Sequence, residues 1–304
     1  MYRILNNGIN EMDTAINQQQ TIEISENFID LEKIISGKSP RLLKVIPTFI
    51  LSYIKNIIHL KELNAAIYRN RNVIGIDFAT EILKEFGVKI NVFGIENIPL
   101  TGRYIVASNH PLGGMDGMAL ISRIGAVRPD IMFPVNDLLM NLPQLKPIFI
   151  PINKHGKNTD NIKILEETFA SDVMILYFPA GLCSRKQKKG IIKDMDWKKT
   201  FITKSKRYQR DVIPVYIDGK NTNFFYNLSK IRKNLGIKAN IEMLYLVDEM
   251  YKQKDKTINI IIGKPITYLT FDKKFSDQEW AEKMKEKVYK MSIESVGKDM
   301  NLLD

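Results

Sequence analysis

Short apolar runs and helix-type patterns alternate along the last two-thirds of the chain. Residues 88–92 alternate apolar and polar side chains, which is typical of a half-buried strand. Further apolar runs of strand length are 104–107, 131–135, 173–178, 212–217, 241–246 and 258–262. Between them, Thr159 or Asp160 can cap a helix, and residues 276–279 form a capping box before another. The alternation predicts an α/β fold with a mostly parallel central sheet flanked by helices.

A predicted helix over residues 40–60 is apolar around most of its circumference. Pro40 suits its first turn, and Pro47 is expected to kink it. Two interpretations of the apolar surface stay open: the helix lies in a membrane interface, or it packs over the protein's own core. On this basis we predict a helical, membrane-facing region over residues 1–85 and an α/β domain over residues 86–304.

The candidate chemistry follows one of the predicted strands. That strand leads into Asn109 and His110, and Asp116 follows after a turn that contains Gly113 and Gly114. A histidine removes the proton of a weak nucleophile when a carboxylate orients its ring, so we predict His110 as a general base and Asp116 as its orienting residue. Asp116 can also cap the next helix, and Asn109 can serve to shape the turn. The alternative is that His110 is a core histidine bonded to the backbone. Its position between a strand and a double-glycine turn disfavours this alternative.

Four segments resemble, in order, the signature blocks of the glycerolipid acyltransferases, the family that includes the lysophosphatidic acid acyltransferases. The first is Asn109-His110 with Asp116, the second is residues 146–154, the third is residues 178–185 and the fourth is residues 212–216. With the closing strand and turn at 258–265, the resemblance extends over roughly residues 88–266. It implies transfer of a fatty acyl group from a thioester of acyl carrier protein or coenzyme A to the hydroxyl of a lyso-lipid. No cofactor or metal ion is implied.

The resemblance also implies a substrate site around His110. Backbone amides of the glycines in the first and third blocks would hold the oxyanion that forms during acyl transfer. Arg185 and Lys154 are each candidates for binding an anion, with a solvated side chain as the alternative. The implied substrate-binding residues are Asn109, Gly113, Gly114, Asn153, Lys154, Gly181, Ser184 and Arg185.

Two departures from the family pattern bear on the acceptor. Five residues separate His110 from Asp116 where the family has four, and the glycines between them can adopt positive φ and accommodate the extra residue. Ala180 stands where the family has glutamate, and Arg185 lies two positions late. Both departures resemble the bacterial branch that O-acylates N-acyl amino acids to form ornithine or glycine lipids, some members of which are called hemolysins. The implied acceptor is an N-(3-hydroxyacyl) amino acid. The alternatives are acylation of lysophosphatidic acid and a non-catalytic, membrane-binding, hemolysin-like protein.

Most of the net charge of +11 lies in one segment. Residues 184–210 contain eleven lysine or arginine residues and only two acidic residues, Asp194 and Asp196. The segment is expected to attract an acidic acyl carrier protein, the phosphates of coenzyme A or an anionic membrane surface, or else to be a solvated face. Nucleic acid binding is not expected, because the run lacks interleaved aromatic residues and a recognition motif.

Cysteine content and hydropathy indicate the compartment. The single cysteine, Cys183, permits no internal disulfide and is expected to be a packed thiol rather than a nucleophile. The amino end lacks the apolar run of a signal peptide, and no apolar run reaches the length of about eighteen residues that a membrane-spanning helix needs. We predict a peripheral protein at the cytoplasmic face of the cell membrane.

Overall fold

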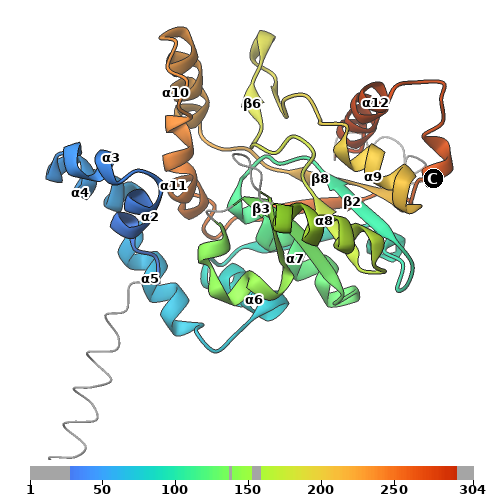
Figure 1. Ribbon diagram of the computed structural model, residues 1–304, viewed down its shortest axis with the longest axis horizontal. Coiled ribbons are helices and arrows are strands. Elements are labelled where there is room, and N and C mark those ends of the chain that lie inside the picture. The colour runs from blue at the N-terminus through green and yellow to red at the C-terminus, as the bar shows by residue number, and fades with distance from the viewer. Residues whose placement is uncertain (1–27, 137–138, 153–158, 293–304) are drawn as a thin grey trace, which may run out of the picture.

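The computed structural model describes residues 28–136, 139–152 and 159–292. Within this part of the chain, a seven-stranded sheet has the order β1-β9-β8-β2-β5-β3-β4 (Figure 1). Its strands are β1 (Lys89–Phe93), β2 (Tyr104–Ser108), β3 (Ile131–Asn136), β4 (Phe149–Ile152), β5 (Met174–Tyr177), β8 (Asp211–Asp218) and β9 (Thr257–Ile262). Neighbouring strands are parallel except β8 and β9, which are antiparallel. The predicted fold class, an α/β fold with a mostly parallel sheet, is confirmed.

Helices flank both faces of this sheet. The helices of the described part of the chain are α2 (Leu31–Lys38), α3 (Pro40–Val45), α4 (Thr48–Ile57), α5 (Leu60–Arg69), α6 (Gly75–Glu85), α7 (Gly114–Val127), α8 (Thr159–Ala170), α9 (Thr200–Tyr208), α10 (Asn223–Asn234), α11 (Leu246–Tyr251) and α12 (Asp277–Lys290). Figure 1 shows α6 and α7 below the sheet and α9 and α12 above it. Because side chains alternate along a strand, Val106 of β2 packs in the core with α6 and α7, whereas Ile105 and Ala107 pack with α9 and α12. This burial on both faces explains the continuous apolar run in the sequence.

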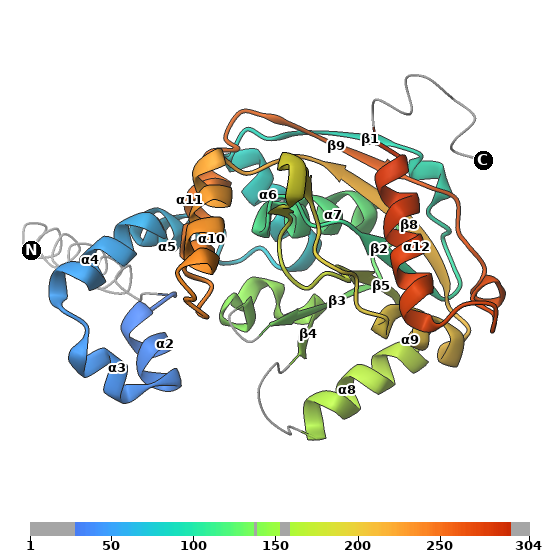
Figure 2. The ribbon, with the colours of Figure 1, turned by 90° about the horizontal axis from the view of Figure 1, so that it is seen from above.

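Pro47 separates two helices of the amino-terminal region. The helix predicted over residues 40–60 is broken into α3 and α4 rather than kinked, because proline has no N–H to continue the helical ladder. No residue of α4 is buried, and Val45, Phe49 and Tyr53 are 72%, 74% and 53% exposed. Figure 2 shows α2 to α4 extending away from the sheet. The described residues leave this apolar surface uncovered, and its contact with lipid stays a prediction.

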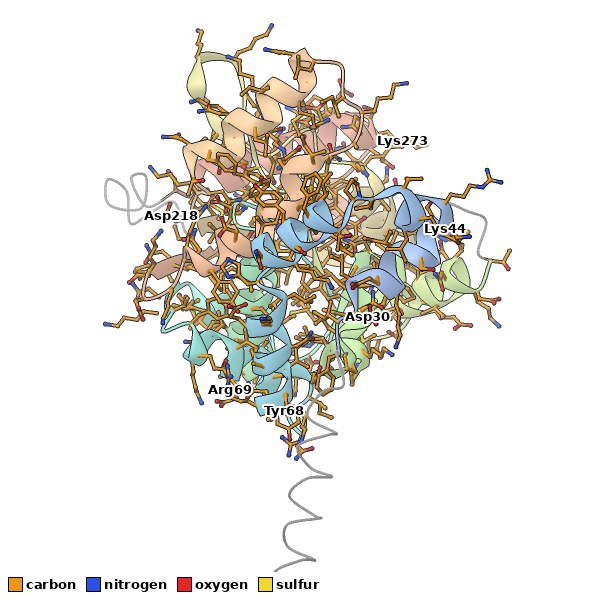
Figure 3. All side chains as sticks on the ribbon, turned by 90° about the vertical axis from the view of Figure 1, so that its left-hand side faces the viewer. Asp30, Lys44, Tyr68, Arg69, Asp218 and Lys273 are labelled. Atoms are coloured by element: carbon orange, nitrogen blue, oxygen red, sulfur yellow. The ribbon has the colours of Figure 1, made fainter. Side chains whose placement is uncertain are left out.

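Side-chain contacts attach α5 to the α/β part of the chain. Arg69, labelled at the lower end of α5 in Figure 3, donates two hydrogen bonds to Glu85 of α6, at 3.0 and 2.8 Å. At the other end of α5, Nε2 of His59 lies 3.0 Å from Asp248 of α11, and the His59 ring stacks on Tyr251. The amino-terminal helices are therefore fixed at both ends of α5.

The predicted domain division falls within one continuous core. Helix α6 ends at Glu85 with Phe86 as its cap residue, and Gly87 has a φ of 58°. However, Phe78 and Ile82 of α6 pack in the same cluster as Val106 of β2. The division after residue 85 stays a prediction, and α6 is packed with the elements that follow it. Among the described helices, none is long and apolar enough to span a bilayer.

Two segments differ from the predicted elements. The strand predicted over residues 241–246 is wrong, because η5, a 3₁₀ helix (Ile241–Tyr245), leads there into α11. Glu242 interrupts the apolar run, and its carboxylate is fully buried against two arginines. Strand β4 lies in the second block, for which no strand was predicted.

Candidate active site

The imidazole of His110 is held by a carboxylate, as the sequence predicted. Nδ1 of His110 lies 3.0 Å from Oδ2 of Asp116, which is fully buried, while 17% of the His110 side chain is exposed. A hydrogen bond from Nδ1 to a carboxylate leaves Nε2 as the nitrogen that can accept a proton. The pair therefore has the geometry of an oriented general base.

A glycine turn brings Asp116 to the ring. Gly113 has φ 81° and ψ −125°, a conformation that residues with a side chain rarely adopt, and a Cβ there would lie 3.3 Å from Sγ of Cys183. Oδ2 of Asp116 also accepts the backbone N–H groups of Leu112 at 2.7 Å and Gly113 at 3.0 Å. Gly113 thus accommodates the fifth residue of the His110 to Asp116 spacing, whereas Gly114 does not have positive φ and begins α7.

The third block packs directly against the first. The ring of Phe178 stacks on the ring of His110 with centroids 4.0 Å apart, and the backbone N–H of Ser184 donates to the carbonyl of His110 at 2.8 Å. These contacts arise because β2 and β5 are parallel neighbours, so the loops after both strands leave the same edge of the sheet.

Asp194 connects the two blocks and was not predicted from the sequence. Oδ1 of this fully buried carboxylate accepts the backbone N–H of His110 at 3.2 Å and the hydroxyl of Ser184 at 2.6 Å. Its Oδ2 accepts Nε1–H of Trp197 at 2.9 Å, and its own N–H donates to the hydroxyl of Tyr289 at 2.7 Å. One signal was available, since Asp194 is one of two acids in a strongly basic segment.

The protonation of His110 reflects opposing effects. Burial lowers the pKa of His110, but the Cys183 sulfur and the Asp116 carboxylate outweigh it and raise that pKa to about 10. Burial raises the pKa of Asp116, and the hydrogen bonds from His110, Leu112 and Gly113 oppose that rise. The raised pKa favours the protonated imidazole, and His110 can act as a base only after losing that proton.

Arg185 is placed differently from both sequence-based alternatives. It is only 4% exposed, and its Nη2 lies 3.1 Å from Oε1 of Glu242, whose Oε2 lies 2.7 Å from Nε of Arg232. Burial raises the pKa of Glu242, but Arg232 and Arg185 hold it below its ordinary value. Arg185 is thus not solvated, and it shares one buried carboxylate with Arg232.

The remaining predicted site residues divide into four groups. Asn109 joins β2 to β8, because its amide exchanges two hydrogen bonds with the backbone of Ile217, at 2.9 and 2.7 Å. The N–H groups of Gly113 and Gly181 donate within the protein, to Asp116 and to the carbonyl of Phe178 respectively. The N–H of Gly114, at the start of α7, has no acceptor among the described residues. Asn153 and Lys154 lie outside the described residues.

Comparison with known proteins decides the family. Residues 33–296 match the family described as Acyltransferase. The chain belongs to this family. This acyltransferase is 48% identical over 266 residues to the lyso-glycine lipid O-acyltransferase of Bacteroides thetaiotaomicron, which covers 87% of this chain and 97% of that protein. It is 49% identical over 266 residues to the lyso-glycine lipid O-acyltransferase of Phocaeicola vulgatus, with 87% of this chain and 95% of that protein covered.

A solved structure is also similar to this acyltransferase. It is the 1-acyl-sn-glycerophosphate acyltransferase PlsC of Thermotoga maritima, with 16% sequence identity and a TM-score of 0.42. The similarity covers 80% of this chain and 92% of that chain.

Proposed function

We propose that this acyltransferase moves a fatty acyl group from an acyl thioester to the hydroxyl of a lyso-glycine lipid, an N-(3-hydroxyacyl) glycine. The similarity to two proteins named lyso-glycine lipid O-acyltransferases, at 48% and 49% identity over almost their whole length, is the observation that supports this acceptor most. The oriented His110 supplies the base that a hydroxyl acceptor needs.

In the proposed reaction, the acceptor hydroxyl attacks the thioester carbonyl. Nε2 of neutral His110 takes the hydroxyl proton as the C–O bond forms, and Asp116 stabilises the resulting imidazolium. The tetrahedral intermediate then collapses, the C–S bond breaks, and His110 returns the proton to the leaving thiolate. The N–H of Gly114 is the proposed oxyanion donor, since it lies at the amino end of α7 where the helix dipole also favours negative charge.

The charges near the third block favour a carboxylate acceptor over a phosphate monoester. A phosphate headgroup carries nearly two negative charges and is best held by a guanidinium that is free to bind it, whereas the Arg185 guanidinium is buried and bonded to Glu242, which it shares with Arg232. Lys198 is the cation that we propose for the carboxylate of the acceptor. Its backbone N–H donates to the carbonyl of Pro179, and its Nζ lies 3.6 Å from the position of a Cβ on Gly181. Lys198 is exposed and forms no ion pair with the described residues.

The acyl donor and the cellular location are further parts of the proposal. We propose acyl carrier protein or coenzyme A as the thioester carrier, because the lysine-rich segment after the third block suits either an acidic protein or phosphates. The exposed apolar residues of α4 support a peripheral position at the cytoplasmic face of the membrane.

Lipid analysis in a host without amino acid lipids tests this function. The host would express the protein and be fed N-(3-hydroxyacyl) glycine, and its lipids would be examined by mass spectrometry. The account expects a product heavier than the fed lipid by the mass of one fatty acid less one water, and expects none with the folded variant His110→Ala. No such product with the unaltered protein would reject the proposal. A gain of diacylated phosphatidic acid from fed lysophosphatidic acid instead would identify the alternative acceptor.

A further inference from the structure

Two neighbouring elements project together from the body of the molecule. One is the carboxyl-terminal half of α10 with the loop that follows it, and the other is the hairpin of β6 (Arg185–Lys186) and β7 (Ile192–Lys193). The two elements pack against each other, and Figure 1 shows both at the top of the molecule, away from the sheet. We call this surface the projecting tip, comprising residues 230–238 and 186–191.

The projecting tip combines exposed aliphatic side chains with lysines. Ile231, Leu235 and Ile237 at the end of α10 are 55%, 69% and 40% exposed, and Ile191 in the hairpin is 55% exposed. The lysines of the tip are all exposed, and they are Lys186, Lys188, Lys189, Lys230, Lys233 and Lys238. No acidic residue occurs in residues 219–241 or 185–193. The tip therefore combines exposed apolar side chains with positive charge alone.

Buried charges hold the tip in place. Nη1 of Arg232 donates to the carbonyl of Ile237 at 2.9 Å, and Nε of Arg232 lies 2.7 Å from Glu242. Gly236, with φ 70°, reverses the chain so that this contact forms. The aliphatic side chains of the tip are thus exposed on an ordered support rather than at a frayed helix end.

The same carboxylate fixes the hairpin to α10. Glu242 also binds Arg185 of β6 at 3.1 Å, and the Arg185 guanidinium lies over the ring of Phe225 of α10 at 4.9 Å. Through Ser184, which donates to Asp194, this arrangement continues to the backbone of His110. A chain of buried polar contacts therefore links the tip to the catalytic loop.

We propose that the projecting tip docks on an anionic lipid surface, as a second membrane contact in addition to the amino-terminal helices. An anionic membrane surface suits the tip for two reasons. The aliphatic side chains can insert among the lipid acyl chains, and the lysines can bind the anionic headgroups. An acidic protein would satisfy the lysines but would also have to supply an apolar surface that matches four exposed aliphatic side chains. The amino-terminal helices contact the other end of α10, since Tyr53 of α4 bonds Tyr245 at 2.7 Å and Tyr245 packs on Phe224 near the start of α10. Docking of both the tip and the amino-terminal helices would fix the distance between His110 and the bilayer that holds the lipid acceptor.

Vesicle sedimentation with the full chain tests this proposal. The variant Leu235→Ser/Ile237→Ser is compared with Leu269→Ser, which removes a residue of equal exposure, 69%, from η6 (Tyr268–Thr270). With vesicles containing phosphatidylglycerol, the tip variant is expected to bind about tenfold or more weakly, and Leu269→Ser as the unaltered protein does. Lys233→Gln/Lys238→Gln is expected to weaken binding by about fivefold per lysine, with Lys287→Gln/Lys290→Gln of α12 as the control. High salt should weaken binding in the same direction.

Two further measurements separate the possible outcomes. The first is turnover in detergent micelles, which is expected to be the same in the tip variants and in the unaltered protein. If the proposed acyl transfer is wrong, the micelle assay would show it, whereas vesicle sedimentation would be unaffected. Unchanged vesicle binding in Leu235→Ser/Ile237→Ser would overturn the proposal. So would a lysine variant that loses binding to immobilised acyl carrier protein but keeps its binding to vesicles, because it would make the tip a protein-binding site.

Discussion

The buried carboxylate of Asp194 accepts the backbone N–H of His110 at 3.2 Å, although 84 residues separate the two in the chain. The same oxygen accepts the hydroxyl of Ser184, so one side chain fixes the catalytic loop against the third block. Asp194 touches neither ring nitrogen of His110, and we therefore regard it as a positioning residue.

Replacing Asp194 should cost both stability and turnover. Asp194→Ala leaves buried donors of His110, Ser184 and Trp197 unpaired, at about 1–3 kcal/mol for each such group, so thermal unfolding should occur at a clearly lower temperature. Asp194→Asn keeps an oxygen for His110 and is expected to recover part of kcat. If Asp194→Ala unfolds as the unaltered protein does and keeps its full kcat, the positioning role is refuted.

The pH dependence of the reaction should report on Asp116. A general base works when neutral, so kcat/KM should rise with pH until it levels off near the pKa of His110, which is about 10. Asp116 raises that pKa, and Asp116→Asn should therefore move the rise to lower pH while reducing the maximal rate. Asp194→Asn is the matched control, because it changes a buried carboxylate that does not contact the ring. A profile for Asp116→Asn that keeps its midpoint, or moves to higher pH, would contradict this assignment.

Cys183 should be dispensable for acyl transfer. Its thiol is fully buried and packs with Phe225, Tyr226 and Leu246, which agrees with the packed thiol expected from the sequence. Cys183→Ala should keep most of the turnover at neutral pH, and its kcat/KM profile should shift to lower pH because the sulfur helps raise the pKa of His110. Loss of all turnover in a variant with unchanged thermal unfolding, or an acyl group trapped on this sulfur, would indicate covalent catalysis instead.

Lys198 should affect acceptor binding more than chemistry. Lys198→Gln removes the charge proposed for the acceptor carboxylate, so the KM for N-(3-hydroxyacyl) glycine should increase by about tenfold with a smaller change in kcat. Lys199→Gln, the adjacent exposed lysine, is the matched control. Equal KM values for the two variants would remove Lys198 from the acceptor site.

Much of the fold was predictable because its central strands are buried on both faces. Val106 and Ile105 point into different layers, so the strand appears in the sequence as an unbroken apolar run. The assignment of short apolar runs to strands failed at residues 241–246, since an apolar run alone does not distinguish a strand from a short helix. The buried pairing of Glu242 with Arg185 depends on a contact between segments 57 residues apart, which periodicity does not encode.

The candidate site was predictable where its chemistry is local in sequence. His110 and Asp116 lie in one turn, and their contact was inferred from spacing and residue type. Asp194 contacts residues that are distant in sequence, so its role could not be inferred from its neighbours in the chain. The sequence indicated only that it is an acidic residue in a basic segment. Asn109 was assigned to substrate binding by resemblance, whereas its amide is engaged with the backbone of β8.

The acceptor preference of the purified protein tests the central claim most directly. With one thioester donor and matched detergent, kcat/KM would be measured for N-(3-hydroxyacyl) glycine and for lysophosphatidic acid. Because the Arg185 guanidinium is buried and engaged with Glu242, the account predicts a value at least about tenfold higher for the glycine acceptor, which corresponds to about 1.4 kcal/mol in the transition state. A higher kcat/KM for lysophosphatidic acid would contradict it.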